Sequence, residues 1–267
     1  MYHPNVRVER DGHVATVTLD RPESKNACTG EMWVALGATF RDLGFSGARV
    51  IVLTGANENF CTGADLGGSR AETPDTDGVS RPLGTMTDAM RVLADSVLAI
   101  HQCPVPVVAK VDGLCVGAGL GLALAADLTY CSDRARFSAI FAKRGLSLDF
   151  GTSWLLRQRI GVHQAKELVF TAKMMSAGDA AAIGFVNAVF PLADFDAGVA
   201  DVVDTIAAGP PIALASSKRE LDSAGSSSLA HALEVEALAQ SVNIQTADMR
   251  EALVAYMERR PPTFEGR

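Results

Sequence analysis

One carboxylate stands alone in a stretch of mostly small and apolar residues, "FSAIFAKRGLSLDFGTSWLL", at positions 137–156. This acid, Asp149, lies between Leu148 and Phe150. A carboxylate buried among apolar side chains has a raised pKa, which suits a group that moves protons near neutral pH. Aspartate is also a common N-cap, and a helix is predicted to begin near Gly151. By this pattern alone, capping is the favoured role of Asp149 and acid–base catalysis is the alternative.

Two glycine-rich segments offer a second chemical feature. They are "FCTGADLGG" at residues 60–68 and "VDGLCVGAGLGLALAAD" at residues 111–127. Each follows an apolar strand, the position at which α/β sheets bind ligands. Small residues there let a ligand reach backbone N–H groups, and a helix N-terminus adds positive potential. Two such donors that converge on one oxygen would form an oxyanion hole.

The second glycine segment has two other interpretations. Gly117 and Gly119 fit the start of a dinucleotide-binding G-x-G-x-x-G motif, and Asp133 stands where an acid might bind a ribose. Leu122 occupies the third glycine position, however, where it would block close helix–strand packing, so this interpretation is disfavoured. The glycines could also serve helix packing alone, but that leaves the segment "CTGADL" unexplained.

The remaining elements indicate how these residues are positioned. Apolar runs predict strands at residues 14–22, 48–55, 105–113 and 128–133. Helical spacing predicts helices at residues 31–43, 85–103, 119–127 and 246–260. Strands and helices alternate until residue 191, and the rest of the chain is helical. The pattern predicts an α/β core of mostly parallel strands with a helical C-terminal portion.

Composition excludes several classes of function. The 267 residues are 48% apolar and carry a formal net charge of -7 without a Lys/Arg cluster, which argues against nucleic acid as a partner. No apolar run is long enough to span a membrane, and the N-terminus shows no secretion signal. The five cysteines form no CxxC pair, and the five histidines lack metal-ligand spacing. These features predict a soluble cytoplasmic protein without a metal.

Six segments together make the chain similar to the crotonase (enoyl-CoA hydratase/isomerase) superfamily. They are, in the family's order, "LDRPESKNA", "ENFCTGADL", "KVDGLCVGAGLGLALAADL", "FAKRGLSLDFGTSWLLRQRIG", "AAAIGFVNAVFP" and "YMERRPPTFEGR". The resemblance implies a crotonase-like spiral of ββα units over residues 1–200, and a helical trimerisation region over residues 201–267. It also implies assembly as a homotrimer or a dimer of trimers. The implied ligand is an acyl-CoA thioester, whose CoA belongs to the substrate, so no separate cofactor is expected.

The resemblance also assigns roles to particular residues. By position, the oxyanion donors are the backbone N–H groups of Ala64 and Ala118, where the second site usually has glycine. The implied CoA contacts are Ser24, Lys25, Asp65 and Leu66 together with Ala64, and then Tyr256 and Arg259 in the last helix, often from a neighbouring subunit. For Arg259, compensation of the helix dipole is an equally weighted alternative.

The chain departs from the family's hydratases at two positions. Those hydratases use two glutamates, and this chain has Gly121 and Phe141 in their places. Addition of water requires one group to activate the water and another to manage the proton at the α-carbon. Asp149 instead occupies the place of the aspartate that isomerase-type members carry in "G-L-x-P-D-x-G-G" patterns, with Leu148 in place of the proline. The family match therefore favours catalysis over capping for Asp149.

The resulting prediction is an enoyl-CoA isomerase that shifts a C=C bond through an oxyanion-stabilised enolate, with Asp149 as acid and base. An apolar wall of Phe141, Leu148, Phe150 and Trp154 would raise the pKa of this aspartate. Three alternatives stay open: an enoyl-CoA hydratase in the broad sense, a family enzyme that uses Asp149 in dehalogenation or ring-opening of aromatic-derived thioesters, and a non-catalytic acyl-CoA-binding protein.

Overall fold

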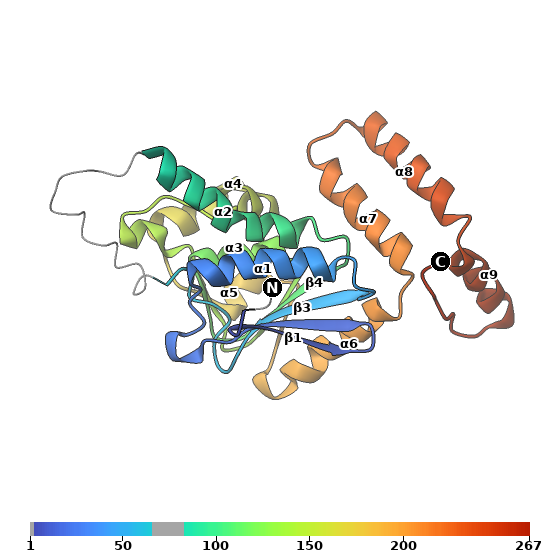
Figure 1. Cartoon of the computed structure of the whole chain (residues 1–267), viewed down its shortest axis with the longest axis horizontal. Coiled ribbons are helices and arrows are strands. Elements are labelled where there is room, and N and C mark those ends of the chain that lie inside the picture. Colours follow the sequence, from blue (N-terminus) through green and yellow to red (C-terminus); the bar gives the residue numbers. More distant parts are fainter. Residues whose placement is uncertain (1–2, 66–82) are drawn as a thin grey trace.

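The computed structural model describes residues 3–65 and 83–267 and is built around a six-stranded sheet (Figure 1). The strand order is β1-β2-β3-β4-β6-β9. The strands are β1 (Val6–Asp11), β2 (Val14–Leu19), β3 (Val50–Gly55), β4 (Val107–Val111), β6 (Leu128–Ser132) and β9 (Ala188–Phe190). β1 is antiparallel to β2, and every other neighbouring pair is parallel. The predicted mostly parallel core is confirmed, with β1 and β9 as additional strands.

A second, three-stranded sheet lies beside the first and contributes to the site. It has the order β5-β7-β8, with β5 at Leu114–Val116, β7 at Arg136–Ser138 and β8 at Met175–Ser176. β5 follows β4 after a turn at Gly113, whose φ is +57°. A Cβ at this position would lie 1.9 Å from the carbonyl oxygen of Glu58, so the turn requires glycine. The turn therefore leads the chain from one sheet into the other at the point where the glycine-rich segment begins.

Alternate side chains of β3 pack on opposite faces of the large sheet. Ile51 and Leu53 belong to the main core, which α1 (Gly30–Leu43), α2 (Leu83–His101) and α3 (Ala118–Ala125) cover. Val50 and Val52 pack instead against α6 (Phe195–Ala207). This two-sided burial explains why β3 is a continuous apolar run rather than an alternating one. The helices over the core are completed by α4 (Thr152–Thr171) and α5 (Ala177–Ala182).

The last three helices form an arm that stands apart from the sheet in Figure 1. This C-terminal arm consists of α7 (Pro211–Ala224), α8 (Leu229–Asn243) and α9 (Ala247–Glu258). The expected boundary at residue 200 lies inside α6, which packs on the sheet; the chain leaves the core after Ala207. The arm exposes many large apolar side chains, among them Leu221, Leu229, Leu233, Leu238, Val242, Ile244, Leu253, Tyr256 and Met257.

Two polar contacts tie the tail after α9 to the rest of the molecule. The buried carboxylate of Asp248 accepts the backbone N–H groups of Glu265 and Gly266. The Arg49 guanidinium, just before β3, donates to the carbonyl oxygen of Phe264 at 2.7 Å. The Asp248 contacts hold the tail on α9, and the Arg49 contact links it to the start of β3, an inner strand of the large sheet.

A test of length and hydropathy finds no single membrane-crossing helix among residues 3–65 and 83–267. One sharply bent pair, Leu192–Ala207 with Pro211–Ala224, passes that test only when the two helices are counted together.

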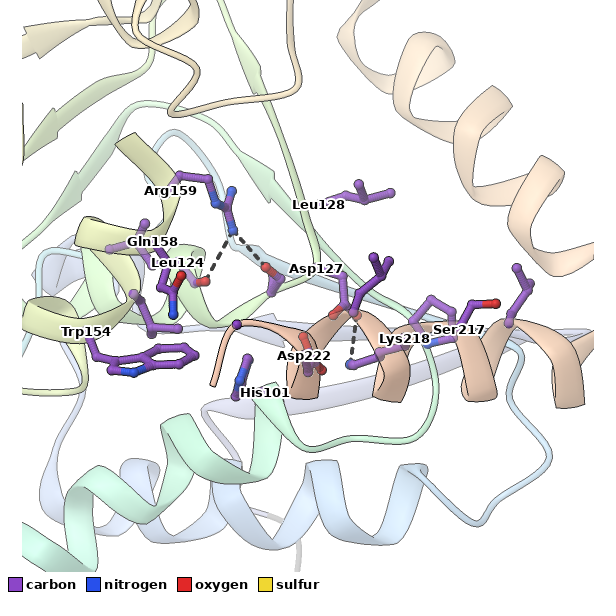
Figure 2. Close-up of a pocket in the computed structure, with 16 residues that line it drawn as sticks. His101, Leu124, Asp127, Leu128, Trp154, Gln158, Arg159, Ser217, Lys218 and Asp222 are labelled. Carbon is purple, nitrogen blue, oxygen red and sulfur yellow. Dashed lines mark hydrogen bonds and ion pairs between the residues drawn. The ribbon is translucent and has the colours of Figure 1, made fainter. Parts of the chain in front are cut away.

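A buried ion pair attaches α7 to the core, at the cavity drawn in Figure 2. The Lys218 ammonium donates to Asp127 Oδ2 at 2.8 Å, and the same oxygen accepts the Val107 N–H at 2.7 Å. The two side chains are only 9% and 21% exposed. Burial raises the pKa of Asp127, and Lys218 opposes that shift. The Asp127 carboxylate therefore holds α7 against the start of β4.

Loss of the cation should destabilise the fold, because it leaves the Asp127 carboxylate buried without a counter-charge. We expect Lys218→Met to lower the free energy of unfolding by about 3 kcal/mol near neutral pH. The double variant Lys218→Met/Asp127→Asn should recover a large part of that loss, since no unpaired charge remains. Urea denaturation of the three proteins measures the difference. Equal losses in the single and double variants would contradict the assignment.

Candidate active site

Two loops that are distant in the sequence are held together by backbone hydrogen bonds. Cys28 donates its N–H to Gly63 O at 2.8 Å and accepts the Asp65 N–H at 2.9 Å. On the other side, Cys61 donates to Leu114 O and accepts the Val116 N–H, both at 3.0 Å. Residues 61–65 are therefore pinned between the segment before α1 and strand β5.

Glycines allow the two loops to approach each other closely. Gly63 has φ of +96°, and a Cβ on it would lie 3.2 Å from the backbone nitrogen of Ala118. A Cβ on Gly119 would lie 2.3 Å from the carbonyl oxygen of Cys61, which rules out any side chain there without a shift of backbone. The glycines predicted to let a ligand reach backbone N–H groups thus also bring the two loops into direct contact.

The predicted oxyanion donors are on these loops. Ala118 is the first residue of α3, where the helix dipole is positive. Within the described part of the chain, neither the Ala64 N–H nor the Ala118 N–H donates a hydrogen bond. Both residues line the same cavity, so both donors belong to its wall. The arrangement can hold one carbonyl oxygen on which negative charge develops.

The cavity has a volume of about 390 Å³. It contains four of the residues predicted from the sequence: Lys25, Ala64, Ala118 and Asp149. The rest of its lining is Thr62, Gly63, Leu114, Val116, Gly117, Ile140, Phe141, Arg144, Leu146 and Met174. The acid and the two amide-bearing loops therefore line one cavity.

Asp149 does not cap the helix that follows it. Helix α4 has Gly151 at its N-cap, and no side chain accepts there; the backbone carbonyl of Asp149, rather than its carboxylate, accepts the Thr152 N–H at 3.0 Å. The carboxylate oxygen Oδ1 is buried, and among the described residues it has no hydrogen-bond partner. The capping interpretation is wrong, because the carboxylate lines the cavity instead.

The surroundings change the acidity of this carboxyl group. Burial raises the pKa of Asp149 to about 6. No opposite charge compensates for the lost hydration, so desolvation alone accounts for the shift. A carboxyl group of this kind is mostly ionised at neutral pH and still accepts and returns a proton readily.

The two positions at which related hydratases carry glutamates hold no acid. Phe141 is buried and forms part of the cavity wall. Gly121 lies against the backbone of Phe150, and a Cβ on it would be 2.5 Å from the Phe150 carbonyl oxygen. Both positions are thus filled, one by a ring and the other by neighbouring backbone.

The apolar wall expected around Asp149 is only partly correct. Phe141 lines the cavity, Leu148 is half-buried against the core, and the Phe150 ring packs on Trp33 with centroids 4.3 Å apart. Trp154 lies elsewhere: its ring meets His101 at 5.5 Å and lines the cavity of Figure 2 near Asp127. Trp154 lies in the first turn of α4, and the helical geometry directs its side chain away from the cavity that Asp149 lines.

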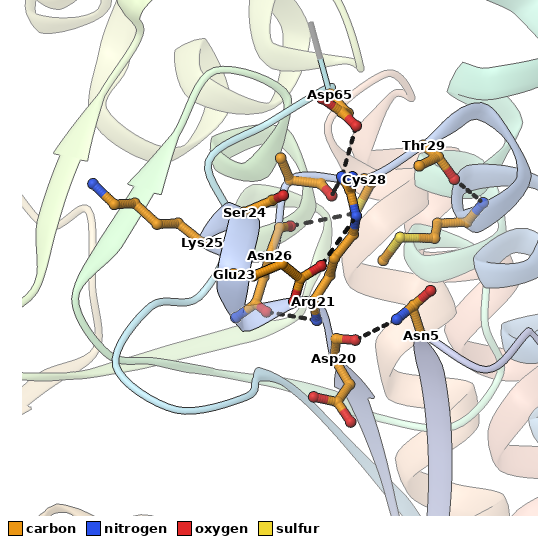
Figure 3. Close-up of polar contacts among 12 residues, drawn as sticks. Asn5, Asp20, Arg21, Glu23, Ser24, Lys25, Asn26, Cys28, Thr29 and Asp65 are labelled. Atoms are coloured by element: carbon orange, nitrogen blue, oxygen red, sulfur yellow. Dashed lines mark hydrogen bonds and ion pairs between the residues drawn. The ribbon is translucent and has the colours of Figure 1, made fainter. Parts of the chain in front are cut away.

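Residues assigned to CoA lie in a short 3₁₀ helix and the adjoining loop (Figure 3). Asp65 accepts a 2.7 Å hydrogen bond from Arg21, and this ion pair fastens the loop that carries Ala64. Ser24 accepts the Thr62 hydroxyl through its backbone carbonyl at 3.4 Å. Lys25 has φ of +51°, and Figure 3 shows its side chain extending away from the Arg21–Asp65 pair.

The other assigned residues that the structure describes do not line this cavity; they are Ser24, Asp65, Tyr256 and Arg259. Leu66 lies outside the described residues. Tyr256 and Arg259 belong to α9 and its C-cap, in the arm, and neither lines the cavity within this chain. Tyr256 is 83% exposed.

The sequence argument did not name several lining residues, among them Arg144, Leu146 and Met174. Arg144, at the end of η2 (Ile140–Arg144), and Leu146 lie in the same stretch of sequence as Asp149, so a sequence argument could have included them. Met174 carries no local signal, since only the pairing of β8 with β7 brings it to the cavity. Within residues 3–65 and 83–267, no three His, Cys, Asp or Glu side chains gather as metal ligands.

Comparison with known proteins identifies the family. The sequence model of the enoyl-CoA hydratase/isomerase family matches residues 9–267. The chain belongs to the enoyl-CoA hydratase/isomerase family. Family members of known name include a "probable enoyl-CoA hydratase" of Rhodobacter capsulatus, 36% identical with 100% of this chain and 99% of that protein covered. A peroxisomal Δ(3,5)-Δ(2,4)-dienoyl-CoA isomerase of Arabidopsis thaliana is 30% identical, with 97% and 95% covered.

Solved structures of the family confirm the predicted crotonase-like fold. An enoyl-CoA hydratase of Bacillus anthracis superimposes with a TM-score of 0.90 at 28% identity, covering 98% of this chain and 100% of that one. A Thermobifida fusca protein in complex with acetoacetyl-CoA gives a TM-score of 0.82 at 31% identity, with 90% and 94% covered. The named relatives thus include both hydratases and an isomerase.

The raised pKa of Asp149 makes a prediction about stability. In the unfolded chain an aspartate has a pKa of about 4, so between about pH 4 and 6 the folded state binds more protons, and stability falls as the pH rises. Above pH 6 the folded protein retains a disfavoured charge. We expect Asp149→Asn to increase the free energy of unfolding by about 1 kcal/mol near pH 8, a value reduced because the carboxylate partly contacts solvent.

Urea denaturation of wild type and Asp149→Asn between about pH 4 and 8 measures this effect. The gain should shrink as the pH falls below 6 and be small near pH 4; only below about pH 3 is the wild-type group neutral in both states. A constant difference across this range would mean that the carboxyl group titrates normally.

Proposed function

We propose that this family member is an enoyl-CoA isomerase that moves a C=C bond of an acyl-CoA thioester, with Asp149 as the acid and base. One observation carries the proposal: an unpartnered carboxylate lines the same cavity as the Ala64 and Ala118 amides, while positions 121 and 141 hold no acid. One carboxylate is sufficient for a 1,3-shift of a proton, whereas the addition of water uses two groups.

In the first step, the thioester carbonyl oxygen accepts the N–H groups of Ala64 and Ala118. The Asp149 carboxylate removes a proton from C2 of a 3-enoyl thioester, and the electron pair of that C–H bond moves into the thioester carbonyl. The product is an extended enolate whose negative charge resides on the oxygen held by the two amides. Donors that are in place before the charge develops stabilise this state without reorganisation.

In the second step, protonated Asp149 returns its proton to C4. The electrons of the enolate reform the thioester carbonyl and create the double bond between C2 and C3. One proton has moved by two carbons, no electron has been gained or lost, and the carboxylate is regenerated. CoA is part of the substrate, and the balance requires no separate cofactor.

The position of the pKa suits both steps. With a pKa of about 6, Asp149 is largely ionised near pH 7 and can act as the base. Its conjugate acid is a weaker acid than an ordinary aspartic acid, so it holds the proton long enough to deliver it to C4. The apolar lining residues Phe141, Leu146 and Met174 limit the access of water that would otherwise compete for the enolate.

CoA recognition is proposed from the family and from the location of the residues. Lys25, at the cavity, is a cation suited to a phosphate of CoA, and Ser24, Asp65 and Leu66 belong to the adjoining edge. Tyr256 and Arg259 would contribute from a neighbouring copy, because in one chain they lie in the arm. The exposed apolar side chains of the arm favour self-association, proposed as a trimer or a dimer of trimers.

Hydration is the second candidate, because the Rhodobacter capsulatus relative is named a hydratase. In that case Asp149 alone would have to activate water and also manage the proton at C2. The two reactions differ in their products, so a single panel of substrates separates them.

The principal prediction concerns Asp149→Asn on a panel of 2- and 3-enoyl-CoA thioesters. Bond migration should fall about 10³-fold, within the range usual for removal of a general acid–base group, while thioester binding persists. Product analysis follows migration and hydration separately, and calorimetric titration with acetoacetyl-CoA follows binding. Asp201→Asn, an exposed position on α6, is the matched control and should retain wild-type rates.

Each other outcome has a distinct meaning. Efficient hydration that is unaffected by Asp149→Asn would refute the assigned role. Tight thioester binding by the wild type without turnover of any panel member would indicate a binding protein.

The pH dependence gives an independent prediction. The base must be ionised, so kcat/KM for migration should rise with pH to a plateau, with its midpoint near pH 6. Stopped assays across about pH 4.5 to 8.5 measure this limb. A midpoint near pH 4 would be inconsistent with a desolvated Asp149 as the base.

A further inference from the structure

The turn that carries Asp149 has an unusual backbone. Phe150 has φ of +46°, and Gly151 follows with φ of +71°. Glycine adopts this left-handed region freely, but for a bulky residue such as phenylalanine it is a strained conformation. Two consecutive residues of this kind, directly after the proposed acid, require contacts elsewhere that hold them in place.

Two such contacts are present at Phe150. Its ring is buried and stacks on the buried ring of Trp33 in α1, with a centroid separation of 4.3 Å. Its backbone rests on Gly121 in α3, where an added Cβ would lie 2.5 Å from Phe150 O and 3.0 Å from Phe150 Cβ. The turn is thus packed between α1, through the contact of the Phe150 ring with Trp33, and α3, where Gly121 leaves room for the Phe150 backbone.

The packing of the Phe150 turn matters because no hydrogen bond from the described residues holds the Asp149 carboxylate in place. Asp149 Oδ1 is buried, and among the described residues no donor binds it. A side chain without hydrogen bonds takes its position from the backbone on which it stands. The next residue in the chain is therefore what determines where the carboxylate lies in the cavity.

We propose that Phe150 is the positioning residue for Asp149, and that the absence of a side chain at Gly121 lets the Phe150 turn pack on α3 in this way. The proposal rests on the function proposed above and deepens it. A side chain at position 121 and the observed turn at Phe150 occupy the same space. A side chain added at position 121 would therefore displace the turn that carries Asp149.

The first test compares two buried phenylalanines. Phe150→Leu removes the ring that stacks on Trp33, and Phe185→Leu removes a similarly buried ring that stacks on Phe137 at 4.9 Å, away from the cavity. We expect Phe150→Leu to lower kcat for bond migration roughly 10- to 100-fold with KM nearly unchanged, because the base is displaced while the thioester site is intact. Phe185→Leu should lose stability but retain its kcat.

A spectroscopic readout separates positioning from general destabilisation. Carbon-13 NMR of the aspartate carboxyl groups, with Asp149→Asn used to assign the resonance, gives the titration of Asp149 without any substrate. In Phe150→Leu the midpoint should move from near pH 6 toward its ordinary value of about 4, since a loosened turn admits water. In Phe185→Leu it should stay in place. Equal kcat losses and equal midpoints in the two variants would overturn the role of Phe150.

The second test addresses Gly121. We expect Gly121→Glu to lose bond migration without gaining hydration, and Gly121→Ala, a single added methyl, to lose migration roughly tenfold while remaining folded. Thermal denaturation shows whether each variant is folded. If Gly121→Glu does not fold, Gly121→Ala still tests whether a side chain at position 121 disturbs bond migration. A folded Gly121→Glu that keeps migration, or a Gly121→Ala with wild-type kcat and an unmoved Asp149 titration, would overturn the proposal.

The two proposals can fail separately. If Asp149→Asn retains wild-type migration, the proposed function fails. If Asp149→Asn is inactive while Phe150→Leu keeps wild-type kcat and titration, only the positioning proposal fails.

Discussion

The candidate site depends on an ionised carboxylate, that of Asp149, which burial partly removes from water. Folding places the Asp149 carboxylate beside a cavity where, among the described residues, nothing donates to its Oδ1, and a protein selected only for stability would have an uncharged residue there. In the proposed reaction, the unfavourable environment makes the group basic enough to take a proton from carbon. Burial of the Asp149 carboxylate thus lowers the stability of the fold while it raises the basicity of the group. The packing around the carboxylate has to compensate for this loss of stability.

That packing is built from close backbone approaches rather than from polar side chains. Gly63, Gly119 and Gly121 lie where a Cβ would meet backbone atoms of another segment. Each of these contacts brings one more segment to the cavity: the Ala64 loop, helix α3 and the turn at Phe150. The polar contacts, such as the Arg21–Asp65 pair, fasten the loops from outside. The geometry of the site is therefore set by main chain, and the side chains supply acidity and shape.

Much of this organisation could be predicted from the sequence, where the signal is local. The buried parallel strands, the wholly buried helix α3 and the glycine-rich loops follow from apolar runs and from glycine at strand ends. The resemblance added the places of Asp149, Ala64 and Ala118, which the structure brings to one cavity. Pattern alone favoured capping for Asp149, since the left-handed backbone of Phe150, which is held by Trp33 and Gly121, is a product of tertiary contact.

Other features required the structure for different reasons. Strand β1, "VRVERD", was missed because its four charged residues obscure the alternation that β2 shows. Trp154 was misplaced because its direction depends on where α4 begins, and one residue of helix rotates a side chain by about 100°. The roles of Tyr256 and Arg259 involve a partner surface, which no single-chain pattern specifies.

The buried thiols next to the amide-bearing loop have a practical consequence. Cys28 and Cys61 flank that loop, their sulfur atoms are 3.9 Å apart, and burial together with the neighbouring thiol raises the pKa of Cys28 well above its usual value. Alkylating reagents attack thiolates that they can reach, so modification of these cysteines has to wait until the loop separates from the sheet. The rate at which these cysteines are alkylated therefore reports how often the loop of residues 61–65 opens. Mass spectrometry measures this rate without any engineered probe.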